Sequence, residues 1–164
     1  MIRACWIAVL ALILSVPMAA QQCHSLSGRW RMDPTGSFFA GLKLPSQQAE
    51  NETLTITQAG GSIQEEWTFA GTAINGNTSY SFVPDGSEQK IARSGDSEQV
   101  PVSVRAEWQN CTLIVHKKMV AHGSLLLEFK NTYVLSEKGE RLTIFQEAQH
   151  AFIDCERRLV FYRQ

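Results

Sequence analysis

The sequence predicts an all-β protein, an antiparallel up-and-down β-barrel of about eight to ten strands. Along most of the chain after residue 25, apolar side chains alternate with polar ones, as they do in strands that bury one face. No apolar pattern with the period of a helix follows residue 20, and turn-forming residues separate the alternating segments. A chain of 164 residues, 44% of them hydrophobic, is long enough for one domain with a substantial core.

The first strand is expected at residues 28–32, where Trp30 and Met32 share one face before Asp33-Pro34 ends the run. Residues 35–52 are expected to form a long loop with room for one helical turn. Further strands are expected at residues 52–58, 62–69, around 80–82, 89–93 (the weakest), 100–108, 112–120, 124–135, 141–149 and 159–163.

The connections between these strands fall into two groups. Tight turns are expected at residues 60–61, 84–86, 109–110 and 136–139, and longer connections at 33–52, 70–77, 94–99 and 150–156. Because consecutive strands of an up-and-down barrel run in opposite directions, the tight turns gather at one end and the longer connections at the other. The barrel is therefore expected to have one closed end and one open mouth.

Gly28-x-Trp30, just after a signal-like segment and before a chain of strands, resembles the opening motif of the lipocalins and of bacterial lipocalin-like secreted domains. The asymmetry of the connections, with the long first loop at the mouth, is similar to theirs. The resemblance implies that Gly28 and Trp30 close the tight end and that an arginine from late in the chain, Arg163 or Arg158, packs on the tryptophan. The Thr-Asp-Tyr motif of the true lipocalins is replaced by residues 131–133, Asn-Thr-Tyr, so the resemblance is to a lipocalin-like domain.

Residues 1–20 have the composition of a cleaved secretory signal. Arg3 precedes an apolar run over residues 4–16, and Ala19-Ala20 ends the segment. The run is shorter than the ~20 residues that a membrane anchor needs. We therefore expect a leader over 1–20 and one lipocalin-like domain over 21–164, in a secreted or periplasmic protein with no stable membrane insertion after cleavage.

The charge of the mature chain disfavours polyanionic partners. The chain has 15 basic and 16 acidic residues, and Arg3 leaves with the leader, so the net charge becomes minus 2. A basic nucleic-acid-binding surface and a polybasic membrane-binding patch are therefore not expected.

Three cysteines, Cys23, Cys111 and Cys155, remain after cleavage of the leader. An odd number in an oxidising compartment predicts one disulfide and one free thiol. Strand directions place Cys23 and Cys111 at the tight end and Cys155 at the mouth. Of the three possible pairings, Cys23–Cys111 is therefore favoured.

Two charged residues lie on otherwise apolar strand faces. Glu65 lies between Ile63 and Trp67, and Lys117 lies between Val115 and Met119. A buried charge needs a counter-ion, a water or a ligand group. The two residues pair with each other, face solvent, or fix the polar end of a ligand.

No catalytic motif is present. The chain lacks Gly-x-Ser-x-Gly, His-Glu-x-x-His, a phosphate-binding loop and a calcium-loop spacing, so we expect no enzyme activity and no cofactor. His122 and His150 are expected at the mouth, near the Asp, Cys and Glu at 154–156. Such groups bind transition metals, but polar loop tips carry them by chance, and no metal site is predicted.

The expected function is non-covalent binding of a small hydrophobic or amphipathic ligand inside the barrel. The alternative is a filled barrel that acts through its surface as a protein interaction or inhibitor module. The predicted ligand-lining residues are Phe38, Phe39, Leu42, Trp67, Tyr80, Phe82, Val115, Lys117, Met119 and Phe129, with Lys117 or Glu65 at the polar end of the ligand.

Overall fold

The computed structural model describes residues 23–40, 51–70, 75–91, 102–121, 124–150 and 153–164. In this part of the chain every regular element is a strand, and no helix is long and apolar enough to cross a membrane. The strands are β1 (Gly28–Met32), β2 (Phe38–Ala40), β3 (Asn51–Ala59), β4 (Ser62–Ala70), β5 (Asn75–Phe82), β6 (Asp85–Ile91), β7 (Val102–Gln109), β8 (Thr112–Ala121), β9 (Ser124–Leu135), β10 (Arg141–His150) and β11 (Ile153–Arg163).

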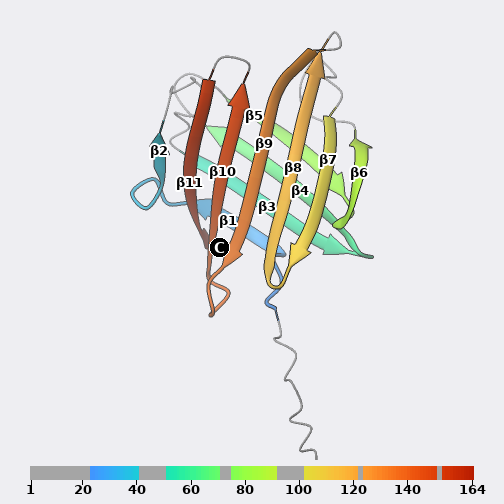
Figure 1. The fold of residues 1–164 in the computed structure, drawn as a ribbon. Coiled ribbons are helices and arrows are strands. Elements are labelled where there is room, and N and C mark those ends of the chain that lie inside the picture. The colour runs from blue at the N-terminus through green and yellow to red at the C-terminus, as the bar shows by residue number, and fades with distance from the viewer. Residues whose placement is uncertain (1–22, 41–50, 71–74, 92–101, 122–123, 151–152) are drawn as a thin grey trace, which may run out of the picture.

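The strands form one antiparallel sheet in the order β5-β4-β3-β1-β11-β10-β9-β8-β7-β6, with β2 paired to β11. In Figure 1, β7 to β11 form the front wall, and β1, β3, β4 and β5 cross behind them, so that the sheet curls into a nearly closed barrel. The predicted up-and-down β-barrel is therefore confirmed. β1 pairs with β3 on one side and with β11 on the other, which joins the beginning of the domain to its last strand.

The two ends of the barrel differ, as the strand directions predict. The β3–β4, β7–β8 and β9–β10 turns lie at the same end as Cys23 and the C-terminus, which we call the tight end. Gly60, Gly61 and Gly139 have φ angles of 58°, 82° and 70°, the left-handed backbone that such turns require. At the opposite end, the loop end, β3 and β11 begin and β8 and β10 finish.

The predicted connection at residues 150–156 is wrong, because most of it is strand. β10 extends to His150, β11 begins at Ile153, and these two residues pair across the hairpin. Four charged residues at 154 and 156–158 hide the strand alternation in this segment. Cys155 is nevertheless buried, and the Arg157 side chain is 13% exposed.

Three further boundaries differ from expectation. β5 begins at Asn75, within the connection predicted at residues 70–77. Residues 38–40, expected in a long loop, form β2. They pair with residues 156–158 of β11, on the side of β11 that is not paired with β10 and next to the segment that pairs with β1. β6 begins at Asp85 rather than at Gln89, with a register shift between Asp85 and Glu88. The Gln89 side chain holds this corner: its amide accepts from Val83 N at 2.8 Å and donates to Val83 O at 2.6 Å. The leader, Leu42 and residues 94–99 lie outside the described residues.

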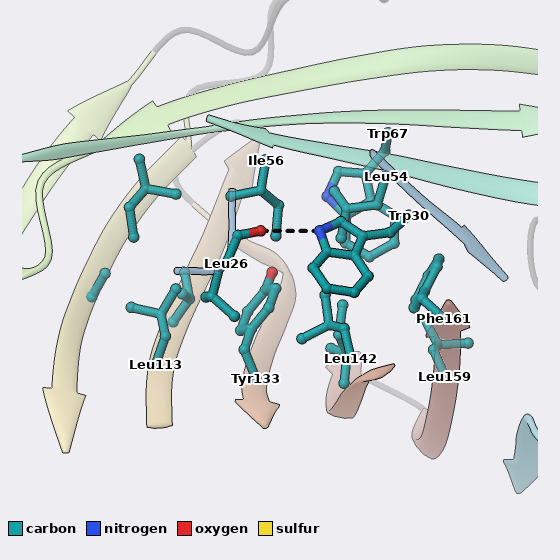
Figure 2. Close-up of a cluster of buried hydrophobic side chains, with 14 of the residues drawn as sticks. Leu26, Trp30, Leu54, Ile56, Trp67, Leu113, Tyr133, Leu142, Leu159 and Phe161 are labelled. Atoms are coloured by element: carbon teal, nitrogen blue, oxygen red, sulfur yellow. Dashed lines mark hydrogen bonds between the residues drawn. The ribbon is translucent and has the colours of Figure 1, made fainter. Parts of the chain in front are cut away.

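An apolar cluster fills the interior of the barrel (Figure 2) and extends toward the loop end as far as Val102 and Met119. Trp30 is fully buried at its centre, and its indole N–H donates to Leu26 O at 3.0 Å. Burying side chains of this size from both walls contributes about 25 cal/mol per Å² of apolar surface. Other fully buried members of the cluster are Leu54, Leu113, Tyr133, Leu142, Ile144, Leu159 and Phe161.

Arg163 closes the tight end over this tryptophan. Its guanidinium carbon lies 4.3 Å from the centre of the Trp30 ring, and its nitrogens donate to Ser27 O at 2.6 Å and Gly139 O at 2.9 Å. Of the two candidate arginines, Arg163 is therefore the one on the tryptophan. Gly28 has a φ angle of 148°, a backbone conformation that favours glycine, and a Cβ atom there would lie 2.7 Å from Arg163 Nη1.

Arg163→Ala should lower the free energy of unfolding by about 1 to 3 kcal/mol, because it removes a cation–π contact and charged hydrogen bonds to backbone carbonyls. Arg158→Ala is the matched control on the same strand, since the exposed Arg158 contributes one long 3.4 Å hydrogen bond to Gly36 O. Urea unfolding measures both. Equal losses in the two variants would contradict this role for Arg163.

A disulfide joins Cys23 to Cys111, residues 88 apart in the sequence. This is the pairing that the strand directions favour. The third cysteine, Cys155, is a buried thiol on β11. The bridge ties the segment before β1 to the β7–β8 turn at the tight end.

Candidate functional site

The inward side chains of β8 become slightly more exposed from the tight end to the loop end. Along β8 the inward positions Leu113, Val115, Lys117 and Met119 are 0, 0, 5 and 9% exposed, in that order. These positions run from the tight end to the loop end. All four side chains are buried, and their exposed fraction rises only slightly toward the loop end.

A similar trend appears on β9 and β10 but not on β7, where Val102 at the loop end is 1% exposed. On β9, Tyr133 is fully buried, whereas Phe129, two inward positions closer to the loop end, is half-buried. On β10, Ile144 is fully buried and Ala148 is 5% exposed. Phe129 pairs with both Lys117 and Ala148, so these residues lie side by side on the interior wall.

Glu65 and Lys117 form an ion pair across the barrel. Lys117 Nζ lies 2.6 Å from Glu65 Oε2, and both side chains are buried. The indole N–H of Trp67 donates to the same carboxylate oxygen at 3.2 Å, and the ammonium lies 4.1 Å from the centre of the Tyr80 ring. Of the alternatives that the sequence leaves open for these residues, the structure shows the pair. Lys117 is therefore already engaged by a carboxylate of its own chain.

A second set of polar side chains, from β11, β10 and β9, forms hydrogen bonds across the interior. Arg157 Nε donates to Gln146 Oε1, and Gln146 Nε2 donates to Asn131 Oδ1 at 2.8 Å. Asn131 Nδ2 in turn lies 3.3 Å from the Tyr133 hydroxyl. At the other side of Arg157, Nη1 lies 3.6 Å from Glu52 Oε1 on β3. We call these five residues the interior polar chain.

The interior polar chain meets the Glu65–Lys117 pair at Tyr133. Burial raises the pKa of the Tyr133 hydroxyl well above its ordinary value of 10.0, and the nearby Glu65 carboxylate raises it further. Tyr133 therefore stays neutral, and the two polar groups form one network inside the barrel.

Three buried carboxylate oxygens in this network have no hydrogen-bond donor within the described part of the chain. They are both oxygens of Glu52 and Oε1 of Glu65. Leaving a buried acceptor without a donor costs about 1 to 3 kcal/mol. Burial raises the pKa of the Glu52 carboxyl, and the attraction of Arg157 offsets this only in part. These three oxygens of the network can therefore still accept hydrogen bonds.

Glu52→Gln should raise the thermal unfolding midpoint at neutral pH. The pKa of Glu52 is higher in the folded protein than its ordinary 4.5, so the native state binds more protons and loses stability as the pH rises through the interval between the two values. The gain should disappear near about pH 3, where the carboxyl is protonated in both states.

Glu66→Gln is the control for this experiment, because Glu66 is exposed on β4. Calorimetry of both variants across this pH range measures the effect. A lower midpoint for Glu52→Gln at neutral pH would show that the Arg157 attraction outweighs the cost of burying the carboxylate.

The sequence predicted only part of this arrangement. Glu65 and Lys117 were singled out, but Glu52 and Arg157 were not. Glu52 lies at the edge of a predicted strand, and Arg157 lies between the predicted connection at 150–156 and the predicted strand at 159–163. The strand period contained a usable signal: Asn131 and Gln146 each occupy an inward position between apolar residues.

The predicted ligand-lining residues lie in three settings. Trp67, Phe82, Val115 and Met119 are buried in the apolar cluster, and Tyr80 and Phe129 are half-buried on the interior wall. Phe38 is 55% exposed on β2, beside Arg158 of β11. Phe39 also belongs to β2, and its side chain, like Leu42, lies outside what the structure describes.

The outer surface has one described groove, across β6 to β9. It is polar, and its Lys118 and Glu128 form an exposed ion pair at 3.4 Å. The described residues contain no group of three or more His, Cys, Asp or Glu side chains that could hold a metal ion. His122 and the side chain of His150 lie outside that description. The groove is lined by Glu88, Ser103, Arg105, His116, Lys118 and Glu128.

The sequence matches no protein-family model and no curated protein. Solved structures match the fold. Secretory abundant heat soluble protein 4 from Ramazzottius varieornatus is 14% identical, with a TM-score of 0.56 over 84% of this chain and 94% of that one. The fold is a calycin-like β-barrel.

Two fatty-acid-binding proteins share this calycin-like barrel. Fatty-acid-binding protein 1 of Echinococcus granulosus is 14% identical, with a TM-score of 0.50 over 84% of this chain and 96% of that one. The Schistosoma mansoni fatty acid binding protein, in complex with arachidonic acid, is 13% identical, with a TM-score of 0.51 over 84% and 95%. At such identities the likeness is one of fold.

Proposed function

We propose that this chain binds a small hydrophobic or amphipathic molecule non-covalently in the loop half of its barrel. The observation that carries the proposal is that inward-facing aromatic side chains, Phe129 and Tyr80, are only half-buried on the interior wall. Two proteins of similar fold are named for fatty-acid binding, which supports the same use of the interior here.

Burial of an apolar tail supplies the binding energy in this proposal. At about 25 cal/mol per Å², removing roughly 300 Å² of a tail from water gives about 7 kcal/mol before the cost of immobilising the ligand. Half-buried aromatic rings provide apolar contact area without needing a partner for a polar group. The ligand is bound and released unchanged, so the proposal includes no catalytic step.

We further propose that the protein acts outside the cytoplasm, as a secreted or periplasmic carrier of the lipocalin-like type. The Cys23–Cys111 disulfide supports this, because disulfides form and persist in oxidising compartments. The leader-like residues 1–20 support it independently. N-terminal sequencing of exported material, expected to begin near Gln21, tests the proposal.

Ala148→Trp should weaken binding of a dodecyl-chain fluorescent probe at least about tenfold, because the added ring occupies the loop half of the interior. Ala148 faces inward on β10 beside Phe129. Fluorescence titration measures the affinity, and thermal unfolding shows whether the variant remains folded.

Phe145→Trp is the matched control, since Phe145 lies on the same strand, faces outward and is 44% exposed. Its affinity should equal that of the unaltered protein. If the unaltered protein shows no saturable binding of the probe, the filled barrel acting through its surface replaces this proposal.

A further inference from the structure

We propose that the ligand carries a neutral hydroxyl head group and that the Glu52 carboxylate accepts its hydrogen bond. This inference rests on the proposed function and narrows the ligand class to long-chain alcohols and other hydroxyl-bearing amphiphiles. It separates the chain from carriers of fatty acids, whose head group is a carboxylate.

The charges of the interior already cancel. Glu65 pairs with Lys117 at 2.6 Å, and Glu52 faces Arg157 at 3.6 Å. Arg157 also donates to Gln146, so both interior cations of the described network are engaged. A ligand carboxylate would add a third negative charge to a space that holds two buried carboxylates, without a free cation to receive it.

The hydrogen-bonding capacity of the interior is unbalanced toward acceptors. Both oxygens of Glu52 and Oε1 of Glu65 are buried and have no donor among the described residues. A carboxylate head group has no proton to offer them, whereas a hydroxyl has one. An ammonium has three, but stripping its water costs far more than stripping that of a hydroxyl. A neutral donor therefore fits the site best.

Glu52 lies at the loop end of the barrel, and its side chain is fully buried. It is the first inward residue of β3, and it pairs with Phe69 of β4. Phe69 and Tyr80 are partly buried and pack against the apolar cluster. A head group on Glu52 would therefore leave its tail against apolar side chains.

Three ligands of equal chain length test the inference on the full exported chain: dodecanol, dodecanoate and dodecylamine. Affinities are measured by competition with the dodecyl-chain probe, and native mass spectrometry checks the stoichiometry. We expect dodecanol to bind at least about tenfold more tightly than either charged ligand. A tighter dodecanoate or dodecylamine would overturn the hydroxyl assignment and leave the proposed function standing. Binding of none of the three would overturn the proposed function itself.

Glu52→Gln then tests the acceptor. The change removes the negative charge and frees Arg157 at nearly constant volume, so the preference for dodecanol over dodecanoate should fall at least about tenfold. Glu66→Gln, on the exposed face of β4, should keep the preference of the unaltered protein. An unchanged preference in a folded Glu52→Gln protein, checked by circular dichroism, would show that Glu52 does not receive the head group.

Discussion

Replacing Lys117 by methionine should lower the free energy of unfolding by about 3 to 5 kcal/mol. The change leaves the side chain volume nearly intact but removes the cation 2.6 Å from Glu65, whose carboxylate is fully buried. The remaining charge then lacks its counter-ion in a region of low polarity, where its second oxygen already has no donor. Urea unfolding at neutral pH measures the loss.

A double variant separates the ion pair from simple packing. Lys117→Met combined with Glu65→Leu should regain most of the lost stability, because replacing a buried pair by apolar residues is often neutral or stabilising. Lys118→Met, one residue along β8 and exposed, should change stability by less than about 0.5 kcal/mol. If the double variant is as unstable as Lys117→Met alone, the loss of unfolding free energy arises from packing and not from the Glu65 carboxylate that has lost its counter-ion.

Removing the disulfide by Cys23→Ser and Cys111→Ser together should cost about 4 to 5 kcal/mol. The bridge closes a loop of 88 residues, and constraining so long a loop lowers the conformational entropy of the unfolded chain. Denaturant unfolding of the double variant and of the oxidised parent measures the difference.

Reduction provides the control for this result. A reductant should destabilise the parent by the same amount and leave the double variant unaffected. Cys155→Ala should retain the parent's sensitivity to reductant, because the disulfide in the structure joins Cys23 to Cys111 and does not include Cys155. Sensitivity that disappears in Cys155→Ala would mean that Cys155 takes part in the bridge.

Strand alternation accounts for most of what the sequence predicted. Where apolar and polar residues alternate cleanly, as in β3, β4 and β8, the predicted strands agree with the structure to within a few residues. The alternation fails at the start of β11, because Arg157 faces inward among other charged residues. An inward arginine is stable there through Gln146 and Glu52, which belong to other strands.

The candidate site depends on contacts across the barrel that no local pattern contains. Glu65 and Lys117 are 52 residues apart, and they meet because the barrel curls β4 toward β8. The sequence showed that each needed a partner, but the identity of that partner depends on closure of the sheet. Glu52 illustrates the same limit, since its burial comes from the opposite wall rather than from its own strand.

The position of β1 between β3 and β11 determines when the barrel can close. Trp30 pairs across the backbone with Arg163, almost the whole domain away in sequence. A ribosome or translocation channel releases the chain from its N-terminus, so the tryptophan emerges long before its partner strand. The wall between β3 and β11 therefore cannot be completed until β11 has been synthesised. Until then Trp30, which is fully buried in the folded protein, lacks one of the two strands that flank it.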